Sequence, residues 1–321
     1  MKIKLSFKTF NYIIIGLVLI IAPLLFINNY YIIYLLSMFL IYSILCLGLN
    51  LITGVAGQFC LGHAGFYGMG AYIAALIATR AVGIPYLLEL LLSAIGAGLF
   101  AVVVAYSCIR VSGDYLAIIT LASAEMFRLT CTNWESLTNG PMGIIGIPYP
   151  RILSVAINNN VKIYYLGLVY FFISLYLCNL ILHSKYGRAF KAIREDEIVA
   201  LSMGVPVFKY KVLVFFIGAF FAGIAGNYVA HLIMFISPDN FTTNTSIYLI
   251  NSIILGGIGT ISGSFIGAGL MLFLTEFLRF APAAWRMVVM AIAIIVVMIK
   301  MPQGIAGSEL DYKKWFNKII K

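Results

Sequence analysis

Ten long apolar stretches fill this chain of 321 residues, and they restrict its fold more than any other feature. A helix of about 20 apolar residues crosses the hydrocarbon core of a bilayer. Hydrophobic residues make up 63% of the chain and charged residues only 10%, which is too little polar surface to cover a soluble globule. We therefore predict an all-α polytopic membrane protein, with residues 1–321 as a single transmembrane domain. The predicted spans are 11–27, 30–49, 59–79, 86–109, 114–132, 163–182, 210–233, 245–256, 262–280 and 284–300.

The distribution of basic residues predicts which side each loop faces. If Met1 is cytoplasmic, 15 of the 21 Lys and Arg residues fall on the cytoplasmic side, in line with the positive-inside rule. This favours an even number of spans, both termini in the cytoplasm and an extracytoplasmic loop at 133–162. The net charge of +10 then belongs to loops that meet anionic lipid headgroups, so we predict contact with membrane lipid and no nucleic-acid partner. The apolar run 12–27 is directly followed by another span, so we interpret it as an uncleaved helix rather than a signal peptide.

Two glycine-dense stretches, 48–79 and 251–270, are poor spans taken alone. Dense glycine breaks a helix, and a broken backbone is tolerated in a membrane only against protein or a water-filled cavity. Their similar positions in the two halves of the chain indicate an internal repeat with a transport route between the halves. Two readings stay open: the glycines serve only close helix packing, or they also line the route. The candidate pathway or gate residues are Asn50, Gln58, Gly62, His63, Asn227, Asn251, Gly256 and Gly257.

Ionisable and metal-binding side chains are sparse within the apolar stretches. Glu125 and Arg128 stand three residues apart, as do Glu276 and Arg279, so each acid reaches its own base on a helix face. We interpret both as structural ion pairs, and we find no series of carboxylates that resembles a proton relay. The five cysteines and three histidines stand singly, which predicts small buried residues and no metal site. No catalytic residue is predicted.

Residues 185–209 form the longest charged interruption between the apolar stretches. Gly187 begins and Gly204 ends a predicted helix of about four turns. Its apolar and basic residues fall on different faces, which predicts an amphipathic helix parallel to the membrane. The four successive charges at Arg194–Glu197 mix both signs, which favours docking to a protein over binding to anionic lipid. The alternative is a solvated or headgroup-bound connector.

Seven sequence blocks resemble the branched-chain amino acid ABC permeases, in particular the LivM-type subunit. They are GLNLITGVAGQFCLGHAGFYGMGAY at 48–72, YLAIITLASAEMFRL at 115–129, NWESLTNGPMGIIGIP at 133–148, GRAFKAIREDEIVALSMGV at 187–205, FISPDNFT at 235–242, SIILGGIGTISGSFIGA at 252–268 and MPQGIAG at 301–307. The resemblance implies that 185–209 is a cytoplasmic coupling loop whose helix fits a groove on an ATPase subunit. The implied ATPase-coupling residues are Gly187, Arg188, Phe190, Ala192, Ile193, Arg194, Glu195, Asp196 and Glu197. Of these, Phe190 and Ile193 are expected to fill an apolar part of the groove.

The resemblance also implies partners and a function. No GxxxxGK[ST] phosphate-binding loop occurs in the sequence, so we expect a transport subunit that holds no cofactor and is not an enzyme. The expected partners are a second permease subunit of the LivH type, two cytoplasmic ATPase subunits and an extracytoplasmic substrate-binding protein. The expected location is the bacterial cytoplasmic (inner) membrane. The expected function is to form the translocation path for leucine, isoleucine and valine in an ATP-driven importer.

Departures from the family's pattern leave the solute open. Cys60 stands where Ser is usual, Ser264 where Pro is common, and Asn227 and Asn251 where small or apolar residues are expected. If these positions face the cavity, they suit a more polar solute. An ABC permease for urea, another amino acid or a sugar therefore stays an alternative. A secondary carrier or integral-membrane enzyme would need a buried acid relay or paired Asp motifs, which the sequence does not show.

Overall fold

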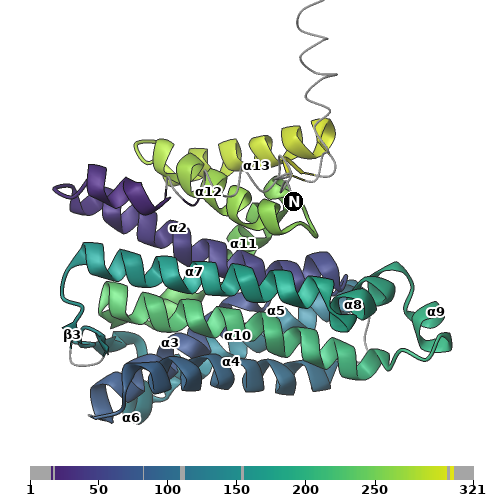
Figure 1. Ribbon diagram of the computed structural model, residues 1–321, viewed down its shortest axis with the longest axis horizontal. Coiled ribbons are helices and arrows are strands. Elements are labelled where there is room, and N and C mark those ends of the chain that lie inside the picture. The colour runs from purple at the N-terminus through teal and green to yellow at the C-terminus, as the bar shows by residue number, and fades with distance from the viewer. Residues whose placement is uncertain are drawn as a thin grey trace, which may run out of the picture.

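The computed structural model describes residues 16, 19–81, 83–108, 113–152, 155–301 and 304–306, and this part of the chain is mostly helical (Figure 1). Its α-helices are α2 (Tyr30–Leu49), α3 (His63–Arg80), α4 (Tyr86–Cys108), α5 (Asp114–Asn133), α6 (Glu135–Thr138), α7 (Asn160–His183), α8 (Lys185–Glu195), α9 (Glu197–Ser202), α10 (Val207–Ile233), α11 (Thr243–Gly256), α12 (Ile261–Phe277) and α13 (Ala283–Lys300). A π-helix, η1 (Asn50–Val55), continues α2, and η2 (Gly140–Met142) and η3 (Pro238–Phe241) are short 3-10 helices. Strand β1 (Ile144–Ile145) pairs antiparallel with β4 (Phe235–Ile236), and β2 (Arg151–Ile152) with β3 (Val155–Ala156).

Within the described ranges, four helices are long and apolar enough to cross a membrane: α2 continued by η1, α4, α7 and α10. A fifth span arises if η3 and α11 are taken together with α12, across a bend of 119°. The protein is thus a helical, multi-pass membrane protein, although fewer helices pass as clear spans than the ten predicted. Helix α3 contains several glycines and α5 several polar residues, so neither is apolar enough to count as a clear span. Within α13, only a shorter apolar helix is found. Part of the predicted span 11–27 lies outside the described residues.

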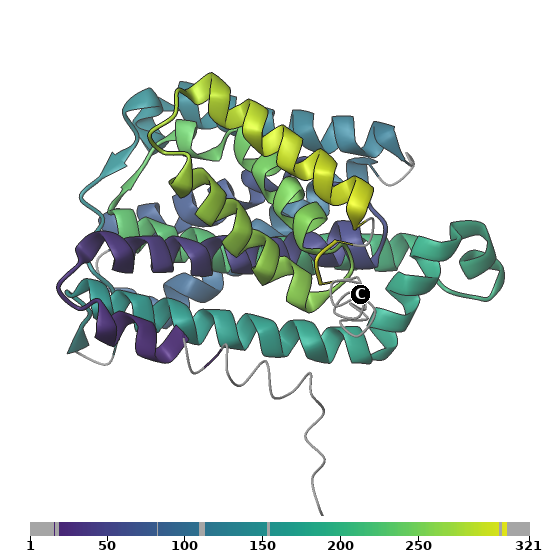
Figure 2. The same cartoon turned by 90° about the horizontal axis from the view of Figure 1, so that it is seen from above.

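Helix α10 lies in the middle of the bundle, against α4, α3 and α2 (Figures 1 and 2). Small residues allow this close approach: a Cβ added to Gly70 of α3 would lie 2.5 Å from the Cα of Gly223 in α10. The same glycine also lies close to α4, since a Cβ added to Gly223 would lie 2.7 Å from the Cα of Ala94 in that helix. The prediction that glycines mediate helix packing is confirmed at these positions.

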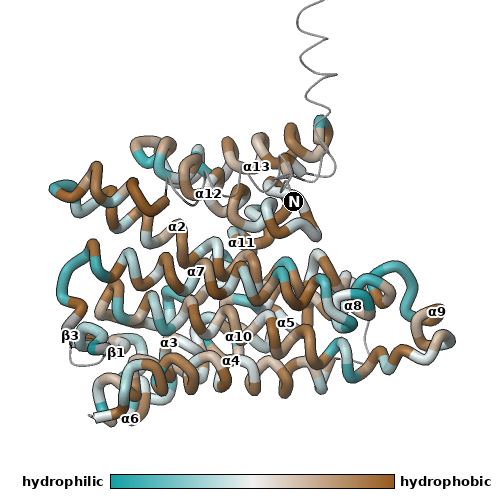
Figure 3. Tube along the Cα trace, viewed as in Figure 1, coloured by the Kyte–Doolittle hydropathy of each residue, from teal (hydrophilic) through white to brown (hydrophobic). Residues whose placement is uncertain are grey.

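Polar residues gather at the two ends of the long helices, whereas the sides of the bundle are largely apolar (Figure 3). On α4, Leu99 is 56% and Val103 is 64% exposed. Such exposure is what lipid tails tolerate and water does not. Helices α8 and α9 lie at one end of the bundle, and the segment 133–162 with its short strands lies at the other (Figure 1). The two segments predicted to face opposite sides of the membrane are therefore at opposite ends of the molecule.

Both glycine-rich stretches break their helices, as the sequence predicts. The first break follows η1, where Gly57 has φ +70° and the next helix starts only at His63. The second break lies between α11 and α12, where Gly257 and Gly259 have φ values of +124° and +82°. L-residues with a Cβ rarely adopt these conformations, so glycine allows the chain to turn here.

Candidate functional site

The charged segment after α7 folds as two helices rather than as the single four-turn helix predicted for it. Asp196 separates α8 from α9 with an extended backbone, φ −161° and ψ 118°. Its carboxylate accepts hydrogen bonds from the backbone N–H groups of Ile198 (2.8 Å) and Val199 (3.0 Å). Asp196 is therefore an N-cap, which starts a new helix where the sequence pattern suggested a continuous one.

The apolar face of α8 is buried in this chain, which corrects the expectation that Phe190 and Ile193 fill a groove on a partner. Phe190 is fully buried and Ile193 is 2% exposed. The Phe190 ring packs edge-to-face on Tyr210 of α10. Sequence periodicity identified the apolar face correctly but not what covers it. The most exposed apolar residues of this segment lie on α9 and the turn after it: Ile198 (78% exposed), Leu201 (63%) and Met203 (80%).

The charges of the segment divide into an inward and an outward group. The guanidinium of Arg194 donates to the carbonyl oxygen of Gly54 in η1, at 2.5 Å. The carboxylate of Glu197 lies 2.6 Å from the ammonium of the buried Lys211 and accepts from the amide of Gln58 at 3.1 Å. The outward group includes Arg188 and Glu195, and also Lys185, Lys191 and Lys209, all of which are exposed. The segment is thus bonded to the first glycine-rich break while it still presents exposed charges at the end of the bundle.

Asn50 joins the first break to the second. Its side-chain oxygen accepts from the backbone N–H of Gly259 at 2.8 Å. Its amide nitrogen donates to the carbonyl of Thr260 (2.8 Å) and to the hydroxyl of Ser264 (2.9 Å). Asn50 and Gln58, two of the predicted pathway residues, therefore lie in one polar junction with Arg194. We call this set, Asn50, Gly54, Gln58, Arg194, Glu197 and Gly259, the coupling junction.

The other candidate pathway residues lie in packed surroundings. A Cβ added to Gly62 would collide with the backbone carbonyl of Thr120 in α5, and one added to Gly256 with that of Gly263 in α12. Gly257 caps the C-terminus of α11. His63 is fully buried, and no hydrogen-bond partner for its ring nitrogens lies among the described residues. Asn251 is half-buried in α11. Close packing accounts for Gly62 and Gly256, and lining of a route stays a prediction.

The positions that depart from the family pattern are mostly buried. Cys60 is fully buried with a free thiol, and Ser264 is buried beside Asn50. Asn227 is fully buried between α10 and α4. These three residues would favour a more polar solute only if they faced a cavity. In this structure they are buried in packed surroundings instead.

A buried polar cluster surrounds Glu89, and the sequence did not predict it. The same carboxylate oxygen of Glu89 accepts from the amide of Asn227 (2.8 Å) and lies 2.6 Å from Nε2 of His231. Nδ1 of His231 lies 2.8 Å from the carbonyl oxygen of Pro148, and the Tyr86 hydroxyl donates to Asn227. Glu89 stands within the apolar stretch 86–109. An acidic residue in such a stretch is the one sequence signal that indicates a buried polar site here. Its partners lie about 140 residues away in the chain, which is why spacing does not reveal them.

Both predicted ion pairs are confirmed. The guanidinium of Arg128 lies 2.5 Å from the carboxylate of Glu125, and that of Arg279 lies 3.4 Å from the carboxylate of Glu276. Glu276 also accepts a hydrogen bond from the Tyr31 hydroxyl. Glu125 and Arg128 lie one turn apart on α5, whereas Arg279 lies in the turn that follows α12 and reaches back to Glu276 on that helix.

Broken apolar helices that meet inside a bundle, with an amphipathic segment bonded to the break, are features of a helical membrane transport protein. The chain belongs to the family described as branched-chain amino acid transport system / permease component, whose family model matches residues 31–298.

The chain is similar to the high-affinity branched-chain amino acid transport system permease protein LivM of Escherichia coli K12, with 31% identity over 83% of this chain and 68% of the relative. It is 31% identical to LivM of Salmonella typhimurium LT2 over 84% of this chain and 68% of that protein. Identity to LivH of Escherichia coli K12 is 27%, over 83% and 91% of the two chains. These relatives confirm the resemblance to the LivM type. No solved structure matches the chain.

Proposed function

We propose that this chain is the LivM-type permease subunit of an ATP-driven importer of branched-chain amino acids in the bacterial inner membrane. The family match and the names of the relatives support the substrate class. The observation that carries the mechanism is the coupling junction, in which Arg194 and Glu197 bond to the first glycine-rich break and Asn50 bonds that break to the second. A displacement of α8 and α9 thus reaches both breaks through hydrogen bonds.

The proposal includes partners that supply energy and substrate. The sequence contains no P-loop motif for nucleotide, so hydrolysis is assigned to two cytoplasmic ATPase subunits. A LivH-type chain is the second permease subunit, since proteins of both names are relatives of this chain. An extracytoplasmic binding protein delivers the amino acid. In this arrangement the chain has ten spans, an internal repeat and both termini in the cytoplasm.

Burial of Phe190 supports a proposal in which the two short helices have different tasks. Since α8 packs on α10 through Phe190, it moves with the bundle as part of a rigid body. The exposed Ile198, Leu201 and Met203 supply the apolar contact with the ATPase, and Arg188 and Glu195 surround it with charge. ATP-driven closure of the ATPases would press on α9 and switch access to the cavity from one side of the membrane to the other.

Vesicles that contain this chain and all its proposed partners test the function. Leucine uptake should require both ATP and the binding protein. Leu201→Asp should lower uptake by at least about tenfold, because truncating the apolar part of a docking surface and burying a charge costs more than about 1.4 kcal/mol. Leu201→Met, which keeps an apolar side chain, should retain uptake. Failure of the wild-type vesicles to take up any branched-chain amino acid contradicts the function, and normal uptake by Leu201→Asp contradicts the docking surface.

A further inference from the structure

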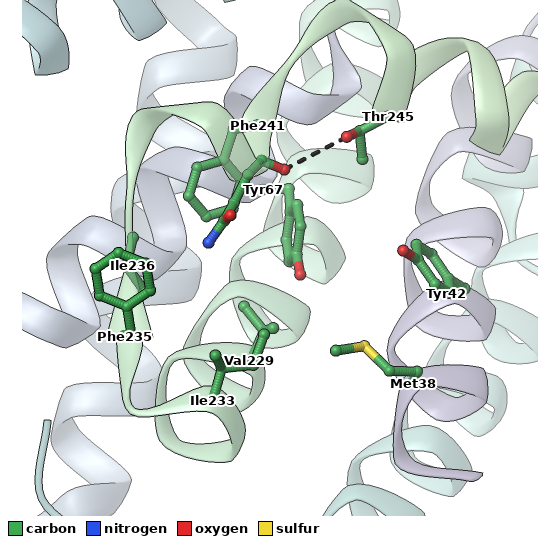
Figure 4. Close-up of a pocket in the computed structure, with 10 residues that line it drawn as sticks. Met38, Tyr42, Tyr67, Val229, Ile233, Phe235, Ile236, Phe241 and Thr245 are labelled. Carbon is green, nitrogen blue, oxygen red and sulfur yellow. Dashed lines mark hydrogen bonds between the residues drawn. The ribbon is translucent and has the colours of Figure 1, made fainter. Parts of the chain in front are cut away.

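We propose that the cavity between α2, α3, α10 and α11 is a transit site for an aliphatic amino acid within this permease. This inference rests on the proposed function and names where this chain holds the solute. The cavity has a volume of about 160 Å³ and lies where α10 ends, at β4 and η3. Figure 4 shows the side chains that line it.

The walls of the cavity match a small aliphatic side chain. Met38 of α2, Val229 of α10 and Ile236 of β4 contribute flexible or branched apolar surface. The ring of Phe241 packs edge-to-face on Tyr67, with ring centroids 5.0 Å apart, and forms a further wall. Apolar side chains with a few polar groups among them are the usual lining of a small-molecule site.

Two tyrosine hydroxyls provide polar groups that lack a partner in the described part of the chain. Tyr67 is only 6% exposed, and its hydroxyl points into the space between Met38 and Val229 (Figure 4). The hydroxyl of Tyr42, from α2, lies on the side of its ring that faces Tyr67. Tyr42 is half-buried, and a hydroxyl that makes no hydrogen bond within the protein can bond to water or to a ligand. These hydroxyls are therefore available to an amino acid's polar end.

The N-terminus of α11 adds an environment for a carboxylate. Thr245, in the first turn of α11, lines the cavity, and the N-cap residue Thr242 makes no side-chain hydrogen bond to the helix. The helix dipole favours an anion at such an end, while the backbone N–H of Thr245 itself donates to the carbonyl oxygen of Thr242. The lining contains no Lys, Arg, Asp or Glu. A site without full charges holds a zwitterion weakly, which suits a solute that must leave again.

The cavity also lies on the expected entry side. Its residues on α10 are at the opposite end of that helix from α8 and α9, as Figure 1 shows for the two ends of the bundle. The binding protein would release its amino acid at this end. An acyl chain of a lipid is the other occupant with apolar chemistry, and the experiment below separates the two.

The first test compares two tyrosines of the same helix. The hydroxyl of Tyr72, also on α3, is buried and makes no hydrogen bond to the described residues, but Tyr72 does not line the cavity. In vesicles holding the complete importer, Tyr67→Phe should raise the KM for leucine about two- to tenfold, the value of one hydrogen bond. Val229→Phe should lower leucine uptake at least about tenfold by filling the cavity. Tyr72→Phe should behave as wild type. Equal effects of Tyr67→Phe and Tyr72→Phe, or normal uptake by Val229→Phe, overturn the inference.

The second test detects occupancy directly in the complete importer. A diazirine-bearing leucine analogue should label residues of the cavity on illumination, and excess leucine should compete. If the wild type transports leucine but the analogue labels only other regions, the transit site is overturned and the proposed function is not. Labelling of the cavity by a diazirine-bearing fatty acid, without competition from leucine, assigns it to lipid and also overturns the inference. If the wild type transports no branched-chain amino acid, the proposed function is overturned. The inference that an amino acid occupies the cavity is then overturned as well.

Discussion

Asn50 shows how one side chain joins two distant breaks. Its amide uses both donor and acceptor on the segment 259–264, more than 200 residues away in the chain. Only an amide of this length offers an acceptor to the Gly259 N–H and donors to Thr260 and Ser264 at once. Aspartate keeps the acceptor and loses both donors, and alanine loses all three bonds.

Substitution of Asn50 tests the coupling junction. Asn50→Ala should destabilise the purified protein by about 1–3 kcal/mol, since it leaves the backbone N–H of Gly259 without its acceptor. Asn251→Ala is the matched control, because that side chain makes no hydrogen bond within the described residues. We expect a lower midpoint of thermal unfolding in detergent for Asn50→Ala only. If both variants unfold at the wild-type temperature, Asn50 does not hold the breaks together.

At the scale of elements, the separation of α8 from α9 decides which surface is presented. A continuous helix would have extended the direction of α8, whereas the N-cap at Asp196 starts α9 in a new direction and leaves Ile198 and Leu201 exposed. Helix α9 has only six residues. A helix this short is marginal without its cap and its packing.

The cap at Asp196 is tested by amide exchange. Asp196→Ala removes two hydrogen bonds to the first turn of α9 and should destabilise that helix by about 0.5–2 kcal/mol. Amide hydrogen exchange over residues 198–202 should speed up, and ATP-driven uptake should fall with it. Asp196→Asn keeps a side-chain oxygen as acceptor and should preserve both. Exchange rates in Asp196→Ala that match those in Asp196→Asn would refute the capping role.

At the scale of the whole molecule, two exposed methionines mark opposite ends of the bundle. Met203 follows α9 and is 80% exposed, and Met142 lies in η2 at the other end of the bundle and is 77% exposed. The five native cysteines are all buried, so they give little background to a thiol reagent.

Thiol labelling tests the proposed orientation. In vesicles of known sidedness, a membrane-impermeant maleimide should label Met203→Cys from the cytoplasmic face only and Met142→Cys from the outer face only. The physical reason is that a charged reagent does not cross the hydrocarbon core. Labelling of both variants from the same face would contradict an arrangement in which α9 and η2 lie on opposite sides.

The features that the sequence determined by itself depend on local interactions along the chain. Apolar runs predict membrane helices, dense glycine predicts the two breaks, and i,i+3 spacing predicts the pairs Glu125–Arg128 and Glu276–Arg279. The amphipathic pattern of 185–209 also found the apolar face of α8. Each of these depends on neighbours within a few turns, so that the chain itself carries the information.

Only the tertiary structure decided which surfaces and polar groups meet. It buried Phe190 against α10, so the docking surface that we propose lies on α9 rather than on α8. It brought Asn50 to Gly259 and Glu89 to His231, pairs separated by 209 and 142 residues. A buried polar group must find a partner wherever the packing of helices supplies one, and that packing depends on the whole bundle rather than on spacing along the chain.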